Sequence, residues 1–195
     1  VGIRLVLART MYDWDGAPAR YRESPADAAR RTRELHAEHA GDPLVAVQPA
    51  PHSPHGASPA MIRAGWEVAE ALDTPFHIHV AEGQYEGQRT LAEHGATPLR
   101  YLDALGVLGP RMIGVHCVWL DDEEIALLAR SGASVAHNPV SDLKLASGIA
   151  RVPDLLAAGV RVTLGTDGAI SGNDLDLWLA LRLAATLHRG ATGRA

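Results

Sequence analysis

The chain has 195 residues, the length of one domain that can bury a hydrophobic core. Its net charge of -5 excludes the basic surface that nucleic-acid binding requires. No apolar run is long enough to cross a bilayer, and the single Cys117 excludes an internal disulfide. We therefore expect a cytoplasmic protein with neither a membrane nor a nucleic acid as partner.

Short apolar runs rich in β-branched residues alternate with amphipathic stretches along the chain. The strand-like runs cover residues 3–10, 44–50, 76–81, 112–118, 133–138 and 161–166. Each run is almost continuously apolar, which is typical of parallel strands covered on both faces. The first run begins at once and lacks the charged leader of a signal peptide. We therefore interpret residues 1–195 as one domain truncated at both ends.

Helices are predicted between these runs from the residues that typically begin and end a helix. Ser24-Pro25 and Ser58-Pro59 each place a capping hydroxyl before a proline in the first turn. The predicted helices begin near residues 25, 59, 98, 122, 152 and 174, and they end near residues 41, 73, 106, 132, 159 and 190.

A succession of strand–helix units indicates an α/β fold with a parallel sheet. Two architectures fit: a doubly wound open sheet, and a (β/α)8 barrel that lacks two units. Periodicity does not separate them. A doubly wound nucleotide-binding fold is disfavoured, because residues 9–16 contain no glycine-rich phosphate turn after the first strand.

Side chains that can bind a metal follow five successive strands. Catalytic groups collect at the carboxyl ends of parallel strands, so these side chains should meet at one rim. They are His52, His55, His77, His79, Glu82, His116, His137 and Asp167. The other histidines, His36, His39, His94 and His188, lie on predicted helices with polar neighbours and are expected at solvated positions.

A divalent ion that activates water needs imidazoles and a carboxylate that converge and leave one coordination position open. Glu82 lies three residues beyond His79 and can fold back over such an ion to move a proton. Gly165 and Thr166 are small enough to let a metal approach Asp167. The pattern predicts hydrolysis of a small-molecule substrate, and a homo-oligomer is compatible with it.

These motifs resemble the amidohydrolase superfamily, in its branch of methylthioadenosine/S-adenosylhomocysteine deaminases, guanine deaminases and triazine hydrolases. The resemblance is carried by Pro51-His52-Ser53-Pro54, His79-Val80-Ala81-Glu82, His116-Cys117, the stretch 137–150 and Gly165-Thr166-Asp167. It implies a (β/α)8 TIM barrel, incomplete here with strands three to eight, so that residues 1–195 form a metal-dependent hydrolase domain. It also implies deamination of a purine-like or other N-heterocyclic substrate with one divalent ion, zinc or alternatively iron.

The resemblance further implies a role for each motif residue. The implied metal ligands are His79, His116 and Asp167. The implied catalytic residues are Glu82, as the acid/base, together with Asp167 and His116. The implied substrate contacts are His52, Arg9 and His137, with Arg20 as a second arginine candidate.

Departures from the family pattern leave alternatives open. The His-x-His pair of the family's first strand is absent, and His77 is a candidate substitute because it shares a strand face with His79. Its position before Glu82 favours His79 alone. His55 and Asp142 stand where the deaminases usually have an aromatic residue and Asn, so the substrate stays open. The alternatives are a triazine or formimino hydrolase, and a non-catalytic fragment.

Overall fold

The structure, a computed structural model, describes residues 2–193. In this part of the chain the strands are β1 (Leu5–Met11), β2 (Val45–Pro51), β3 (Phe76–Val80), β4 (Met112–His116), β5 (Ser134–His137) and β6 (Arg161–Leu164). β1 pairs with β2, and β3, β4, β5 and β6 pair in that order. Every pairing is parallel. The prediction of an α/β fold with parallel strands is therefore confirmed.

Helices connect the strands. They are η1 (Ala19–Tyr21), α1 (Pro25–His39), α2 (Pro59–Ala71), α3 (Gln84–His94), α4 (Pro98–Ala104), α5 (Asp122–Ser131), α6 (Pro139–Lys144), α7 (Val152–Ala157), α8 (Ala169–Gly172) and α9 (Leu177–Thr192). None of the described helices combines the length and apolar character needed to cross a membrane.

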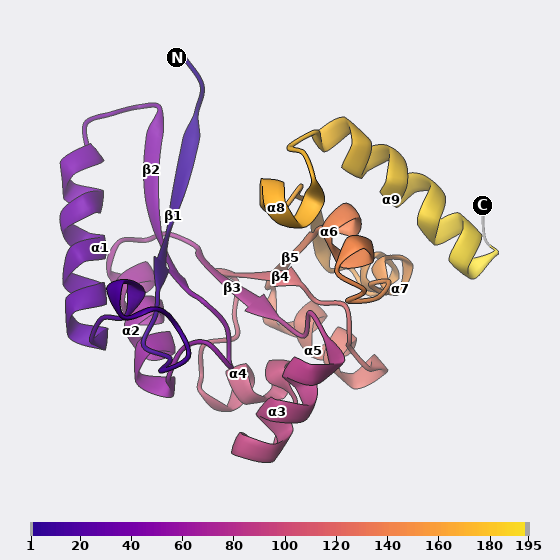
Figure 1. The fold of residues 1–195 in the computed structure, drawn as a ribbon, viewed down its shortest axis with the longest axis horizontal. Coiled ribbons are helices and arrows are strands. Elements are labelled where there is room, and N and C mark those ends of the chain that lie inside the picture. The colour runs from indigo at the N-terminus through magenta and orange to yellow at the C-terminus, as the bar shows by residue number, and fades with distance from the viewer. Residues whose placement is uncertain (1, 194–195) are drawn as a thin grey trace.

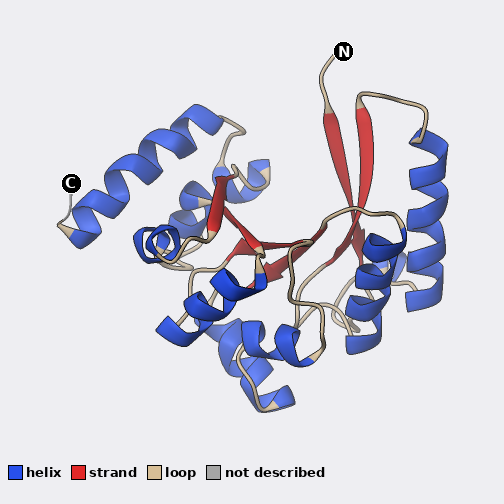
Figure 2. Ribbon diagram, turned by 180° about the vertical axis from the view of Figure 1, so that it is seen from behind, coloured by secondary structure: helices blue, strands red, loops and turns tan. Residues whose placement is uncertain are grey.

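The strands follow an open arc with the helices on its outer side. Figure 1 shows the β1–β2 pair and helices α1 and α2 at one end, and α8 and α9 at the other. The view from behind in Figure 2 shows the same arrangement of helices around the strands. A backbone hydrogen bond from His79 N to His52 O, 3.0 Å long, joins the two sheets where β2 ends. The arc is that of an incomplete (β/α)8 barrel, as predicted.

Local signals placed several helices correctly. The hydroxyls of Ser24 and Ser58 accept hydrogen bonds from backbone N–H groups in the first turns of α1 and α2. Asp121 and Glu124 form a capping box at the start of α5. These side chains satisfy donors that a helix leaves unpaired at its first turn.

The last helix was predicted at residues 174–188 with its end at Gly190, and this prediction was wrong. α9 runs from Leu177 to Thr192, with Asp176 as its N-cap. Gly193 takes the left-handed conformation that ends the helix, with φ 65°. Gly190 lies inside α9. The short helices α6 and α8 were not predicted, and the helix expected at His94, α3, was predicted without bounds.

The expectation that every strand is covered on both faces holds only for the central strands. In β3 and β4, residues that are fully buried alternate with half-buried ones. In β1 the side chains of Leu5, Val6 and Leu7 are exposed, and in β6 Arg161 and Thr163 are exposed. β1 and β6 each pair on one side only within the described residues, which leaves them less covered.

The main core lies between β3, β4 and β5 and the helices outside them. Phe76 on β3 is fully buried and meets the ring of Trp66 on α2 edge-on, with ring centroids 5.4 Å apart. Ile78, Leu102 and Leu128 are also completely buried in this cluster. The core therefore fixes β3, the strand that carries His79.

We expect Phe76→Ala to reduce the free energy of unfolding by about 3–5 kcal/mol, because it leaves a cavity against Trp66. Denaturant unfolding followed by tryptophan fluorescence measures this loss. Ile170→Ala is the control, since Ile170 is 93% exposed and its truncation should change the stability by less than about 0.5 kcal/mol. Equal effects of the two substitutions would contradict the assigned core.

Candidate active site

The carboxyl ends of three strands break sharply beside the predicted site. Ala81 follows β3, His116 and Cys117 stand at the end of β4, and Asp167 follows β6. All four have positive φ, between 51° and 73°, although none is glycine. Such a conformation costs energy and persists only where the surrounding structure enforces it. The chain therefore turns abruptly at the points where sequence reasoning placed the functional groups.

His79 and His116 lie side by side at this rim. Their rings are nearly parallel, with centroids 5.5 Å apart. His79 Nδ1 is 2.7 Å from the carbonyl oxygen of His52, which can only accept, so Nδ1 carries the proton. His116 Nδ1 is 2.8 Å from Asp142 Oδ1 and donates to that carboxylate. In both neutral rings Nε2 then keeps its lone pair.

Behind His116, side chains of α6, β5 and α9 form a buried polar chain. Asp142 Oδ2 faces His137 Nδ1 at 3.4 Å, and His137 Nε2 is 3.2 Å from His188 Nε2. Asp142 and His137 are each 1% exposed. His188 is 8% exposed, so its expected solvated position was wrong: α9 turns this imidazole inward onto His137. The predicted substrate contact by His137 stays a prediction.

In the His116–Asp142 pair, hydrogen bonding and nearby charges shift both pKa values in the direction opposite to the effect of burial. Burial alone would lower the pKa of His116, but the hydrogen bond that His116 donates to Asp142 and the charges of Glu82, Asp142 and Asp167 outweigh it and raise this pKa. Burial would raise the pKa of Asp142, but its hydrogen bond with His116, its close contact with His137 and the charges of these two rings lower it. Asp142 therefore remains a carboxylate.

Glu82 reaches the same rim from the loop after β3. Its Oε2 is 3.6 Å from His116 Nε2, and Ser147 Oγ donates to its Oε1 at 3.4 Å. The backbone N–H of Glu82 donates to Glu86 Oε2 at 2.8 Å. Glu86 is 4% exposed on α3, four residues later, and sequence reasoning missed it. The structure brings Glu82 beside His116, as predicted.

Asp167 is held from two sides. Ser141 Oγ donates to its Oδ2 at 2.6 Å, and the backbone N–H of Gly168 donates to its Oδ1 at 2.7 Å. Burial would raise the pKa of Asp167, but these bonds, together with Ser171 and the charge of His116, lower it. The carboxylate is therefore charged and oriented by Ser141.

Gly165 packs closely against a buried side chain. A Cβ at this position would lie 2.2 Å from Asn138 Oδ1. The absence of a side chain at Gly165 admits the amide of Asn138, which is 3% exposed and whose Nδ2 lies 3.4 Å from His116 Nδ1. The predicted access of a metal to Asp167 past Gly165 and Thr166 stays a prediction. Gly165 is thus required by packing between β5 and β6.

A cavity of 570 Å³ opens between β1, β2 and β3. Its lining consists of Val6, Ala8, Thr10, Ala50, Pro51, His52, His77, Ile78, His79, Val115 and Asp167. His52 stacks on Tyr12 with centroids 4.4 Å apart. Burial, then the charges of His79 and His55, lower the pKa of His52 to about 3. His52 therefore presents a neutral imidazole to this cavity.

His77 also lines the cavity, but its Nε2 is 2.7 Å from Gln48 Oε1 on β2. Because the amide oxygen accepts, the Nε2 of His77 carries a proton in this contact. The ring is therefore engaged by β2 rather than directed at the His79–His116 pair.

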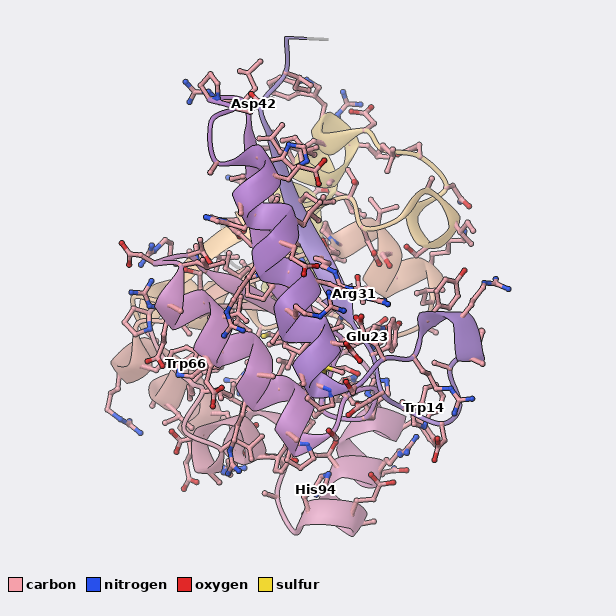
Figure 3. The ribbon with its side chains drawn as sticks, turned by 90° about the vertical axis from the view of Figure 1, so that its left-hand side faces the viewer. Trp14, Glu23, Arg31, Asp42, Trp66 and His94 are labelled. Atoms are coloured by element: carbon pink, nitrogen blue, oxygen red, sulfur yellow. The ribbon has the colours of Figure 1, made fainter. Side chains whose placement is uncertain are left out.

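The two predicted arginines lie elsewhere. Arg9 donates two hydrogen bonds of 2.8 Å to Glu23, and Arg31 on α1 pairs with the same carboxylate at 3.2 Å. Figure 3 shows Glu23 and Arg31 pointing toward one another beside α1. Alternation places Arg9 on the face of β1 opposite Ala8 and Thr10, which line the cavity. Arg20 is exposed and stacks over Tyr21.

Among residues 2–193, no three His, Cys, Asp or Glu side chains are arranged so that they could hold a metal ion. The nitrogen donors do fit a metal, since His79 and His116 stand together with Nδ1 protonated and Nε2 available. The chain thus contains part of a donor set with the chemistry that zinc requires.

Comparison with known proteins defines the class. The profile of the amidohydrolase family matches residues 1–194, so the chain belongs to this family. A 5'-deoxyadenosine deaminase from Methanopyrus kandleri is 39% identical over 189 residues, which cover 97% of this chain and 43% of that protein. A 5-methylthioadenosine/S-adenosylhomocysteine deaminase from Syntrophobacter fumaroxidans is 38% identical over 191 residues, 98% of this chain and 43% of that protein.

Solved structures agree. An adenosine deaminase from Xanthomonas campestris with bound zinc superposes with a TM-score of 0.92 at 36% identity, covering 98% of this chain and 43% of that one. A mutant of an atrazine chlorohydrolase from Arthrobacter aurescens, complexed with zinc and atraton, has a TM-score of 0.92 at 26% identity, with 98% of this chain and 44% of that one covered. The chain spans less than half the length of these relatives. The predicted resemblance to deaminases and triazine hydrolases is confirmed.

We expect Gly165→Ala to destabilise the protein by about 1–3 kcal/mol, because the new methyl group collides with the Asn138 amide. Gly87→Ala is the matched control: nothing lies within 4 Å of a Cβ there, and alanine favours helix α3 by up to about 1 kcal/mol. Denaturant titration of both variants measures the difference. A Gly165→Ala protein as stable as the unsubstituted protein would contradict the packing assigned to Asn138.

Proposed function

We propose that the whole protein is a metal-dependent aminohydrolase that removes an amino group from a purine-like or other N-heterocyclic substrate. The observation that carries this proposal is the stacked His79–His116 pair, in which both Nδ1 atoms are hydrogen-bonded and both Nε2 atoms keep a lone pair. Such a pair is suited to binding a divalent ion. The deaminases that resemble the chain over nearly its whole length support the choice of reaction.

The proposed cofactor is one zinc ion. Bound zinc in the similar adenosine deaminase and atrazine chlorohydrolase supports this choice. Zinc would supply the Lewis acidity that makes water a nucleophile near neutral pH. His79, His116 and Asp167 are the proposed ligands within this chain.

The other proposed roles, proton transfer and substrate contact, belong to side chains of this chain. Glu82 stands 3.6 Å from His116 Nε2 and is proposed to accept a proton at its carboxylate and return it to the substrate. Asp167, charged and held by Ser141, is the proposed second proton acceptor. His52, neutral at the cavity wall, is proposed to contact a heteroatom of the substrate. His137 and Arg9 are also proposed to contact the substrate, in addition to their protein partners His188 and Glu23.

A small molecule is the proposed partner, and the cytoplasm the proposed compartment. The cavity of 570 Å³ beside His52 and His79 has the size of a small-ligand site. Residues 1–195 are proposed to act as the hydrolase barrel segment of the whole protein.

Glu82→Gln should leave zinc bound and reduce turnover by at least about 100-fold, because an amide cannot shuttle a proton. Metal content and deamination rate of the whole protein measure both effects. Glu67→Gln is the control, since Glu67 lies exposed on α2. Turnover of Glu82→Gln at the rate of the control would remove the acid/base role.

Asp167→Asn should lower both the zinc content and the turnover, since it replaces a charged oxygen donor by an amide. Asn is the chosen replacement because it tolerates the positive φ of 59° at this position better than Ala. Asp103→Asn, an exposed change on α4, is the control. Retention of zinc and activity by Asp167→Asn would contradict its assignment as a ligand.

A substrate screen with the zinc-loaded whole protein tests the reaction class. Ammonia release from 5'-deoxyadenosine or another adenosine derivative is the expected result. Turnover only of chloro- or alkylamino-triazines or of a formimino compound would favour another hydrolase of the same superfamily. Failure to bind zinc and to turn over any of these compounds would support the non-catalytic alternative.

A further inference from the structure

The peptide unit that joins Ala81 to Glu82 is held at both of its polar atoms. The carbonyl oxygen of Ala81 accepts hydrogen bonds of 3.0 Å from the backbone N–H groups of Val118 and Trp119. On the other side, the N–H of Glu82 donates to Glu86 Oε2 at 2.8 Å. Because Ala81 has a positive φ of 51°, this turn needs such support to persist. These hydrogen bonds therefore fix the backbone from which the Glu82 side chain extends.

Glu86 lies in the first turn of α3, and the residue is only 4% exposed. A glutamate at the third position of a helix usually binds the N–H of the N-cap residue, which is Gly83 here. Glu86 instead binds the N–H of Glu82, one residue earlier. Helix capping alone therefore does not account for this contact, or for the burial of a group that is costly to remove from water.

The second oxygen of Glu86 faces an imidazole from another loop. Glu86 Oε1 is 3.7 Å from His55 Nδ1, and within residues 2–193 neither atom has a hydrogen-bond partner. A carboxylate only accepts, so a proton on His55 Nδ1 suits this contact. The ring of His55 stands edge-on to that of His52 at the cavity wall, with centroids 5.9 Å apart. Glu86 thus connects the backbone of Glu82 with the loop that carries His52.

The carboxylate of Glu82 has a weaker support from the opposite direction. Ser147 Oγ donates to Glu82 Oε1 at 3.4 Å, and Trp119 Nε1 donates to the carbonyl oxygen of Ser147 at 2.6 Å. The first of these contacts is long for a hydrogen bond between two oxygens. The position of Glu82 therefore depends mainly on its backbone, which Glu86 holds by the N–H.

We propose that Glu86 is a positioning residue of the reaction: its Oε2 binds the Glu82 N–H and its Oε1 pairs with His55, so that the Glu82 carboxylate stays beside His116 and the cavity. This inference rests on the proposed function, because it requires Glu82 as the acid/base. It does not depend on which side chains hold the metal. A displacement of about 1 Å of a group that transfers a proton can cost about 100-fold in rate.

Steady-state kinetics of the zinc-loaded whole protein test the proposal, with ammonia release from 5'-deoxyadenosine, or from the substrate that the screen above identifies, as the readout. Glu86→Leu removes both acceptor oxygens, and we expect kcat to fall at least about tenfold while KM stays within about twofold. Glu86→Gln keeps one acceptor oxygen for the Glu82 N–H and should retain most of the turnover.

Glu93→Leu is the matched control, because Glu93 is exposed on the same helix, and its kinetics should equal those of the unsubstituted protein. A kcat of Glu86→Leu equal to that of the control would overturn the proposal. The proposal also falls if Glu86→Gln is as slow as Glu86→Leu.

A second comparison separates positioning from a general loss of stability. If Glu86 acts through the Glu82 carboxylate, adding Glu86→Leu to Glu82→Gln should lower kcat little further. A substitution that only weakens the fold lowers kcat by the same factor with and without Glu82→Gln. Equal factors would therefore contradict a positioning role.

Hydrogen exchange at the Glu82 amide of the metal-free whole protein gives a readout that is independent of turnover. We expect this amide to exchange slowly in the unsubstituted protein and at least about tenfold faster in Glu86→Leu, because the acceptor is lost. Fast exchange in the unsubstituted protein would overturn the proposal, even if Glu86→Leu does not fold.

The two proposals can fail separately. If the whole protein deaminates no compound of the screen, the proposed function falls and the role of Glu86 falls with it. If Glu82→Gln loses turnover while Glu86→Leu keeps it, the proposed function stands and only the inference about Glu86 falls. Loss of kcat in Glu86→Leu, its recovery in Glu86→Gln and faster exchange at the Glu82 amide support both.

Discussion

Parallel pairing of β3, β4, β5 and β6 is the constraint on which the candidate site depends. Because every strand runs in the same direction, the carboxyl ends meet at one edge and bring residues from distant parts of the chain together. His79 and His116 are 37 positions apart in sequence, yet their ring centroids lie 5.5 Å apart. A core that fixes β3 and β4 therefore also fixes the distance between these imidazoles.

The side chains at the carboxyl ends of the strands are oriented by hydrogen-bond partners that lie behind them. The carbonyl of His52 and the carboxylate of Asp142 each bind one Nδ1, and Ser141 binds one oxygen of Asp167. Glu86 holds the backbone at Glu82. These buried partners decide the tautomer and orientation of the groups that chemistry would use, which is how a low-dielectric interior turns ordinary side chains into a specific site.

Sequence reasoning succeeded where local signals are strong. Ser24, Ser58 and Asp121 cap helices at the expected places, and all six strand-like runs became strands. It failed for α9, because Gly190 resembles a helix end and only the backbone conformation at Gly193 ends the helix. It also missed the burial of His188, since a helix with polar neighbours does not reveal which face packs inward until its partner, His137, is placed.

The sequence by itself determined the class of the protein: the order of His79, Glu82, His116 and Asp167 along successive strands resembles the motif order of the amidohydrolases, and the family profile matches residues 1–194. Only the tertiary structure decided how these groups are held. The contacts of Asp142 with His116, of Ser141 with Asp167 and of Asn138 with Gly165 join segments that are distant in sequence. Such contacts depend on strand order and packing, which no local pattern encodes.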